Sequence, residues 1–342
     1  MARESIVVVC PGRGTYNAPE LGTLARQHGG RAELAMFDAM RAAGGAETLT
    51  VLDGAKKFEP KLHLRGDVAA PLIYAASYLD FLSIDTERFD VVAVTGNSMG
   101  WYTALACAGA VSGEHGFAIA DAMGRNSQRH APGGQAVLVL ADEHWRVDPG
   151  LARAVETACA QAGVLPSIRL GGMLVVAGPE AALDALDAAL KELGPAMPRA
   201  PLRLAGHGPF HTPLMQQSAD AARASLAPEW FGAPQVPLID GRGKIWRRFE
   251  TDTHELWDYT FGHQITAAYD FTAAMTAATR EFAPDRIVLL GPGETLGGAI
   301  GQVLVSASWL DIGGKAGFSE RQEADPFLLA MGRAAQRSMV TR

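Results

Sequence analysis

A serine lies within a glycine-flanked motif at Gly96–Gly100, which reads GNSMG. The largely apolar run Asp90–Thr95 predicts a buried strand before the motif, and Met99–Ala110 predicts a helix after it. This context is typical of a nucleophile elbow, where a tight turn exposes the serine hydroxyl above a helix N-terminus whose N–H groups can stabilise an oxyanion. We therefore predict that Ser98 is a nucleophile; the alternative is a chance match in a glycine-rich chain.

A serine nucleophile needs a base that accepts its proton. The sequence contains nine histidines. His211 is the leading candidate because it lies between a proline turn and a predicted amphipathic helix. His207 is its closest competitor, and a histidine taken alone is more often structural than catalytic.

The elements that would position these residues alternate between strand and helix, which predicts an α/β fold with a mainly parallel sheet. Buried strands are expected at Ile6–Cys10, Asp90–Thr95 and Arg286–Leu290. Helices are expected at Ala69–Phe81, Met99–Ala110, Glu114–Gln128 and from Thr295 onward.

The middle of the chain follows a different pattern, in the order strand, helix, two strands, helix, strand. The segments are Gln135–Leu140, Leu151–Ala162, Ser167–Leu170, Met173–Ala177, Pro179–Leu193 and Arg199–Leu204. This order is the split βαβ, or ferredoxin-like, pattern. We expect residues 132–204 to form a subdomain inserted into a body of residues 1–131 and 205–310. Residues 311–342 are expected to be a C-terminal tail with one helix near Asp325–Gln336.

Composition narrows the function further. The 342 residues are 48% hydrophobic and 20% charged, which is ample for a buried core, and the net charge of −7 disfavours a general nucleic-acid binder. Three separated cysteines and no CxxC motif argue against disulfides or structural zinc. No apolar stretch reaches the length of a transmembrane helix. We expect a cytoplasmic protein that acts without a membrane or nucleic acid.

Five motifs, in order over about residues 6–304, together resemble the malonyl-CoA:acyl-carrier-protein transacylases and the acyltransferase domains of polyketide synthases. They are Pro11–Tyr16 (PGRGTY), Gly96–Leu105 (GNSMGWYTAL), Pro209–Met215 (PFHTPLM), Gln264–Phe271 (QITAAYDF) and Gly291–Ala299 (GPGETLGGA). The resemblance implies an α/β-hydrolase-like body with an inserted ferredoxin-like subdomain, in agreement with the pattern of elements.

The resemblance also implies an activity and a site. An acyl group, malonyl by the family's default, would pass from coenzyme A to the phosphopantetheine thiol of an acyl carrier protein, through an ester on Ser98 and with His211 as base. Backbone N–H groups of Met99 and Arg13 would form the oxyanion hole. The backbone carbonyl at Gln264 would orient the histidine.

Because a carbonyl orients the histidine in this family, no triad carboxylate is implied, and Asp240 and Asp270 are expected to be ordinary turn or surface residues. Neither a metal nor a tightly bound organic cofactor is implied, and the coenzyme A thioester is a substrate. The pathway would be fatty acid or polyketide biosynthesis. Two alternatives stay open: hydrolysis of carrier-protein thioesters, and a non-catalytic scaffold that binds a carrier protein.

One position departs from the family in a way that bears on the substrate. Met123 occupies the place of the arginine that pairs with the malonyl carboxylate, and helix geometry directs Arg125 and Arg129 elsewhere. A buried malonyl carboxylate would then lack a partner. The difference is either neutral drift or a pocket adapted to an uncharged acyl group, and Arg13 could supply a replacement cation.

Other polar family positions have also changed, to Ala69, Asn97 and Trp101. Together with Met123 and Phe210, these residues are expected to line the acyl pocket. A basic run contains Arg242, Lys244, Arg247 and Arg248, with Trp246 among them. It is either a docking surface for a carrier protein or coenzyme A, or a solvated basic loop.

Overall fold

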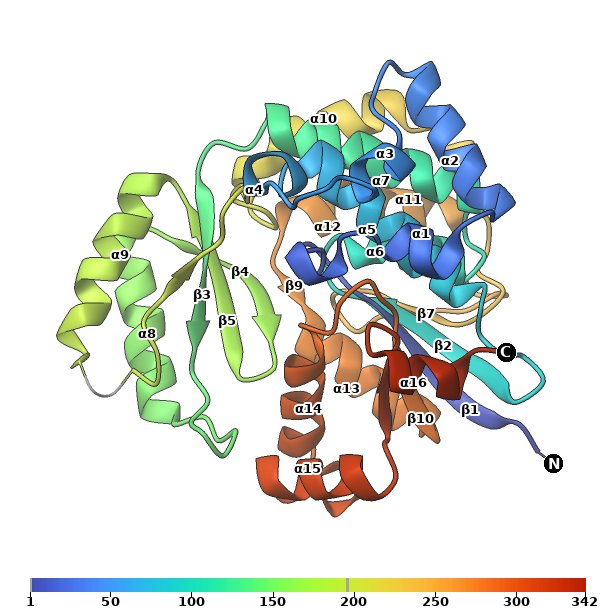
Figure 1. Ribbon diagram of the computed structural model, residues 1–342. Helices are drawn as coiled ribbons and strands as arrows, with labels where there is room; N and C mark the ends of the chain where they lie inside the picture. Colours follow the sequence, from blue (N-terminus) through green and yellow to red (C-terminus); the bar gives the residue numbers. More distant parts are fainter. Residues whose placement is uncertain (1, 195–196) are drawn as a thin grey trace.

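The chain forms two sheets in a computed structural model that describes residues 2–194 and 197–342 (Figure 1). The larger sheet has the order β11-β10-β1-β2-β7-β8. Its strands are Leu328–Ala330, Arg286–Leu289, Glu4–Cys10, Phe89–Gly96, Leu238–Ile239 and Ile245–Trp246. All neighbouring pairs are parallel except the terminal β7–β8 pair. The expected α/β class with a mainly parallel sheet is confirmed.

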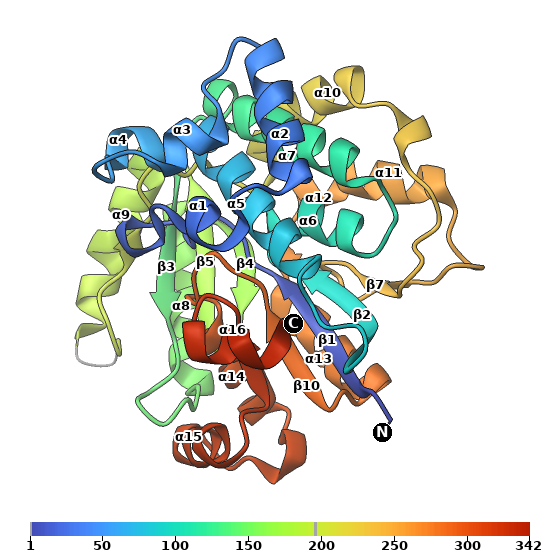
Figure 2. The ribbon, with the colours of Figure 1, turned by 45° about the vertical axis from the view of Figure 1, so that its right-hand side comes forward.

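Buried apolar side chains explain the centre of this sheet. The residues of β1 from Ile6 to Cys10 have no exposed surface, because helices cover both faces of the strand. Figure 2 shows α5 (Gly66–Phe81) and α6 (Gly100–Cys107) on one side of the strands and α13 (Phe271–Phe282) on the other. This layering fixes the end of β2, where Ser98 follows.

The second sheet has the order β6-β3-β5-β4-β9. Its strands are Leu202–Arg203, Gly134–Val139, Met173–Gly178, Leu165–Leu170 and Tyr269–Asp270. The first four are antiparallel and carry helices α8 (Pro149–Ala162) and α9 (Glu180–Glu192), which is the order of elements expected for a split βαβ unit. Strand β9 comes from the body and pairs in parallel with β4. The second sheet therefore combines four strands from residues 134–203 with one strand from residues 269–270.

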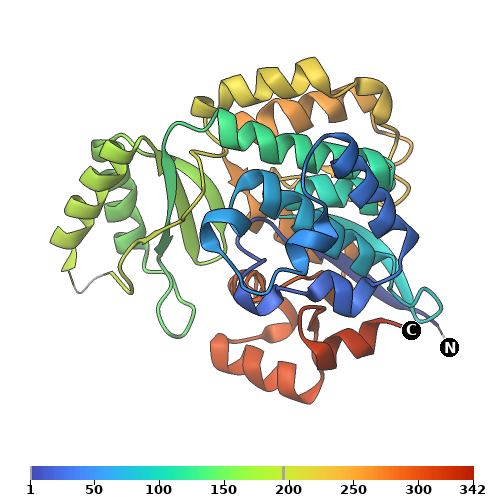
Figure 3. The ribbon, with the colours of Figure 1, turned by 45° about the horizontal axis from the view of Figure 1, so that its top comes forward.

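The remaining helices surround the body. They are α1 (Thr23–His28), α2 (Ala32–Ala43), α3 (Leu49–Asp53), α4 (Pro60–His63), α7 (Gly113–Arg129), α10 (Gln216–Ser225), α11 (Thr253–Phe261), α12 (His263–Thr266), α14 (Gly297–Ser306), α15 (Lys315–Ala324) and α16 (Ala334–Val340). Figure 3 shows α7, α10 and α11 packed in one layer. No helix among the described residues is long and apolar enough to span a membrane.

The C-terminal segment differs from the expected tail. The helix expected near Asp325–Gln336 is wrong, because Leu328–Ala330 forms strand β11 at the edge of the larger sheet, with a helix on each side in sequence. Its three residues are buried and pair in parallel with β10. The body therefore continues beyond residue 310, and its sheet is completed by the end of the chain.

Candidate active site

The turn after β2 holds Ser98 in an unusual backbone conformation. Its φ of 55° lies in the left-handed region that non-glycine residues rarely occupy, and such strain concentrates at functional sites. The flanking glycines are required by close packing: a Cβ at Gly96 would lie 2.3 Å from the carbonyl oxygen of Gly100, and one at Gly100 would lie 2.1 Å from that of Cys10. The GNSMG motif is therefore a tight strand-to-helix turn.

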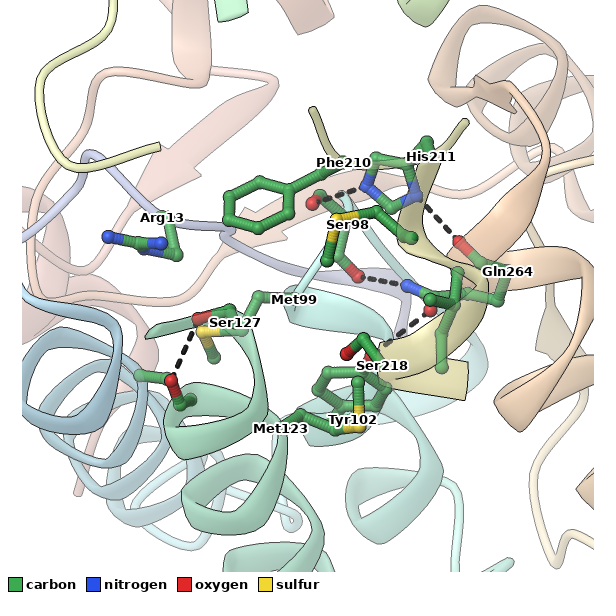
Figure 4. A pocket seen from close by; sticks show the side chains of 14 residues that line it. Arg13, Ser98, Met99, Tyr102, Met123, Ser127, Phe210, His211, Ser218 and Gln264 are labelled. Carbon is green, nitrogen blue, oxygen red and sulfur yellow. Dashed lines mark hydrogen bonds between the residues drawn. The ribbon is translucent and has the colours of Figure 1, made fainter. Parts of the chain in front are cut away.

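Ser98 and His211 are in direct contact. The Ser98 Oγ lies 2.7 Å from His211 Nε2, and His211 Nδ1 lies 2.6 Å from the backbone carbonyl oxygen of Gln264 (Figure 4). A carbonyl can only accept, so Nδ1 carries the proton and Nε2 is left as the acceptor of the Ser98 hydroxyl proton. His211 also has a left-handed φ of 57°. This tautomer is the one a general base requires.

The side chain of Gln264 reinforces this arrangement. Its Nε2 donates to the backbone carbonyl of Ser98 at 3.0 Å, and its Oε1 accepts from the Tyr102 hydroxyl at 3.1 Å. One residue on α12 therefore holds the histidine by its backbone and the elbow by its side chain.

Burial keeps His211 neutral. Loss of hydration lowers the pKa of His211 to about 4, and the nearby His263 contributes in the same direction, whereas the hydrogen bond to Gln264 opposes them. The imidazole is therefore neutral at pH 7 and can accept a proton.

Two backbone N–H groups, of Met99 at the elbow and of Arg13 on the loop after β1, have no acceptor within residues 2–194 and 197–342. Met99 precedes the first turn of α6, where the helix dipole favours negative charge. Both residues line the same cavity as Ser98. An oxyanion hole formed by these two amides stays a prediction.

A cavity opens beside Ser98 and has a volume of about 60 Å³. Figure 4 shows the side chains around it. They come from the loop after β1, from α5, α6 and α7, and from the segments around α10 and α12. The lining residues are Arg13, Ala70, Ser98, Met99, Tyr102, Met123, Gly124, Ser127, Phe210, His211, Met215, Ser218, Gln264 and Ile265.

Met123 lines this cavity, as expected, and no arginine of α7 takes its place. Arg125 turns back to Asp121, with a distance of 2.6 Å between Arg125 Nη1 and Asp121 Oδ2. Neither Arg125 nor Arg129 lines the cavity. The α7 wall beside the nucleophile is therefore uncharged.

Arg13 is the one cationic side chain among the described lining residues besides the titratable His211. Its Nη2 donates to the backbone carbonyls of Leu64 and Gly206 at 2.6 and 2.8 Å, and its guanidinium lies over the Phe210 ring. Burial lowers the pKa of Arg13 to about 10, so the group stays charged at pH 7. In Figure 4, Phe210 lies between Arg13 and His211.

Three of the five residues expected to line the pocket lie elsewhere. Trp101 is buried on another side of α6, where its indole N–H donates to Thr260 Oγ1 at 3.0 Å. Met99 and Tyr102, three residues apart, face the cavity instead. Ala69 and Asn97 are buried but do not line the cavity, which Ala70 does. Met123 and Phe210 do line it.

The other candidate groups have structural contacts. His207 Nδ1 lies 2.8 Å from Gln135 Oε1, so His207 is not the partner of Ser98. Asp270 caps α13 through the Ala273 amide. Asp240 is fully buried and pairs with Arg242. Neither carboxylate contacts His211.

The basic run is also largely committed to local contacts. Lys244 pairs with Glu255 at 2.9 Å, and both Lys244 and Arg242 lie over the Trp246 ring. These pairings favour a structural role for the first half of the run over a free docking surface.

Several lining residues are not predicted from the sequence, among them Tyr102, Met215, Ser218 and Ile265. Met215 and Ser218 are one helical turn apart after His211, a spacing that could have placed both on the face toward the site. Nothing in the sequence indicates that Tyr102, rather than Trp101, lines the cavity.

Several curated proteins have sequences similar to this chain. No protein-family model matches the chain. The malonyl CoA-acyl carrier protein transacylase of Salmonella typhimurium is 28% identical over 214 residues, which cover 60% of this chain and 63% of that protein. The Escherichia coli K12 protein of the same name is 30% identical over 151 residues, or 43% of this chain and 46% of its own length. The matches therefore span less than two thirds of these curated relatives.

Solved structures extend the similarity to the whole chain. The malonyl-CoA:acyl carrier protein transacylase of Xanthomonas oryzae pv. oryzae superposes with a TM-score of 0.74 at 23% identity, over 100% of both chains. A malonyl-transacylase in complex with its type II polyketide-synthase acyl-carrier protein gives 0.73 at 21% identity, over 98% of both. At these identities the structures show a shared fold.

Proposed function

We propose that this chain, a relative of the malonyl-CoA:acyl-carrier-protein transacylases in sequence and fold, is a Ser–His acyltransferase that loads an acyl carrier protein from coenzyme A. The observation that carries the proposal is the chain of contacts from Ser98 Oγ to His211 Nε2 and from His211 Nδ1 to the Gln264 carbonyl, at 2.7 and 2.6 Å. It gives the serine a base in the correct tautomer.

In the first half-reaction, Ser98 Oγ attacks the thioester carbonyl of the acyl-CoA while His211 Nε2 takes the hydroxyl proton. The tetrahedral oxyanion is held by the Met99 and Arg13 amides, and a donor of this kind is typically worth about 3 kcal/mol. The C–S bond then breaks, His211 returns the proton to the departing sulfur, and coenzyme A leaves as the thiol. The product is an ester on Ser98.

In the second half-reaction, the phosphopantetheine thiol of the carrier protein gives its proton to His211 Nε2 and its sulfur attacks the ester carbonyl. The same two amides hold the second oxyanion. The C–O bond breaks and Ser98 Oγ takes the proton back from His211. The enzyme returns to its starting state, and the acyl group has exchanged one thioester for another.

The acyl group we propose is short and uncharged. Met123, Met215 and Ile265 present apolar atoms to a cavity of about 60 Å³, which favours a short acyl chain. Arg13 Nη2 donates to two backbone carbonyls, which hold this guanidinium toward Leu64 and Gly206. A carboxylate placed beside Met123 would be buried without a cation, at a cost of several kcal/mol.

The carrier protein is proposed as the acceptor because the relatives are named for it, and one structural neighbour is described in complex with an acyl-carrier protein. The same ester released to water would instead make the protein a hydrolase. The site geometry suits both outcomes, because they differ in the second nucleophile alone.

Product analysis tests the proposal. The protein is incubated with butyryl-CoA, with and without a phosphopantetheinylated acyl carrier protein, and the products are resolved by mass spectrometry. Transfer predicts butyryl-carrier protein, and little free butyrate when the carrier is omitted. Free butyrate formed at the same rate without the carrier would show a hydrolase, and no turnover with any acyl-CoA would favour a scaffold.

A further inference from the structure

Ser218 places an unpartnered hydroxyl in the wall of the cavity beside the nucleophile. The residue lies on α10, has no exposed surface, and lines the cavity one helical turn after Met215. Its Oγ is buried and has no hydrogen-bond partner within residues 2–194 and 197–342. Figure 4 shows it beside the Tyr102 and Met123 side chains.

Such a hydroxyl is unusual. Buried polar atoms in proteins nearly always have a partner, and a serine inside a helix commonly donates to the carbonyl one turn earlier. Ser225, on the same helix, does this, since its Oγ donates to the Ala221 carbonyl at 2.8 Å. Ser218 does not, so its hydroxyl is left without a protein partner in the wall of the cavity.

The surroundings of Ser218 fix the chemistry of that molecule. The Tyr102 hydroxyl donates to Gln264 Oε1 and keeps lone pairs that can accept. Burial raises the pKa of Tyr102, so it stays neutral. The neighbouring Met123 and Ile265 are apolar. Two neutral oxygens in an apolar wall suit a neutral oxygen on the ligand and give no counter-charge to a carboxylate.

On the basis of the proposed acyltransferase function, we propose that Ser218 hydrogen-bonds a neutral oxygen carried by the acyl chain. The preferred donor is then a short acyl-CoA with a hydroxyl or a ketone on the chain, rather than the plain alkanoyl thioester of the same length. A hydroxyl both accepts from Ser218 and donates to Tyr102, whereas a ketone only accepts. Ser218 is then a residue that determines acyl specificity and takes no part in proton transfer.

The test compares butyryl-CoA, 3-hydroxybutyryl-CoA, acetoacetyl-CoA and malonyl-CoA. Pairs of donors compete for Ser98, and the adducts are weighed on the intact protein. The wild type is expected to favour the oxygenated four-carbon groups over butyryl by roughly tenfold, the size of one neutral hydrogen bond. Ser218→Ala should reduce this preference to within about twofold. Tyr102→Phe should weaken the preference for 3-hydroxybutyryl and leave that for acetoacetyl.

Thr103→Val is the matched control. Thr103 Oγ1 is also buried without a partner, but Thr103 does not line the cavity. This variant should keep the wild-type selectivity, and thermal melts should show all three variants folded.

These outcomes distinguish a failure of the Ser218 proposal from a failure of the proposed acyltransferase function. If Ser98 is acylated but Ser218→Ala keeps the wild-type ratio, the inference is wrong and the acyltransferase proposal stands. A wild-type preference for butyryl or malonyl would also overturn the Ser218 inference. If no thioester acylates Ser98, the proposed function fails and the inference fails with it.

Discussion

The Nδ1 proton of His211 is donated to the backbone carbonyl of Gln264 at 2.6 Å, and this bond alone decides the tautomer of the histidine. A backbone carbonyl carries no titratable charge, so it orients the imidazole without placing a carboxylate beside it. The base beside Ser98 is therefore neutral, buried and correctly protonated.

The low pKa of His211 predicts the pH profile of acylation. Neutral His211 is the reactive form, and its pKa is lowered to about 4, mainly by burial. The rate of Ser98 acylation should therefore stay level from pH 8 to about pH 6 and fall to half near pH 4, which a pH-jump quench experiment measures. A midpoint near 6.5, the ordinary value for histidine, would show that the imidazole is hydrated in the working enzyme.

The side chain of Gln264 should contribute modestly. Gln264→Ala keeps the backbone carbonyl that orients His211 but removes the bonds to the Ser98 carbonyl and the Tyr102 hydroxyl. Two neutral hydrogen bonds, at about 1 kcal/mol each, predict a fall of about thirtyfold in the acylation rate. Stopped-flow release of coenzyme A measures this rate.

Asp270→Asn is the control for that variant, because asparagine also caps helices and Asp270 does not contact His211. The rate should stay within about twofold of the wild type. A loss of two orders of magnitude in Asp270→Asn would instead reveal a carboxylate that acts on the histidine, contrary to the geometry.

Restoring a cation on α7 should change acyl selectivity. Met123 lines the cavity, so the guanidinium in Met123→Arg can pair with a malonyl carboxylate. The ratio of malonyl to butyryl acylation should rise at least tenfold in competition assays. Without an acyl group on Ser98, the variant should melt at a lower temperature than the wild type because the new charge is buried.

Met123→Leu conserves volume and should leave the ratio unchanged. If Met123→Arg folds and its ratio is also unchanged, the α7 wall does not contact the end of the acyl chain. Strong malonyl labelling of the wild type that is lost in Arg13→Met would assign the cation to Arg13 instead.

The contact between Ser98 and His211 could be predicted from the sequence because the signals at both positions are local. The Gly96–Gly100 motif reports a turn so tight that side chains at its glycines would meet backbone oxygens. The choice of His211 over His207 depended on the family motif. In the structure, His211 Nε2 lies 2.7 Å from Ser98 Oγ. The strand and helix order was likewise readable from apolar runs.

The pocket was less predictable, because its lining depends on how each helix is rotated. On α6 the cavity is lined by Tyr102 and not by the adjacent Trp101. Ser218 gives a weak sequence signal, its spacing of one helical turn from Met215, because a serine on an amphipathic helix is usually solvated. Strand β11 was missed because three apolar residues have no measurable period, and its pairing with β10 is a long-range contact.

The most direct test of the account is the mass of the intact protein after brief exposure to a short acyl-CoA, followed by peptide mapping. We expect one acyl adduct on Ser98, its absence in Ser98→Ala, and its retention in Ser225→Ala, which alters an exposed serine on α10. An adduct that persists in Ser98→Ala, or the absence of any adduct in the folded wild type, would contradict it.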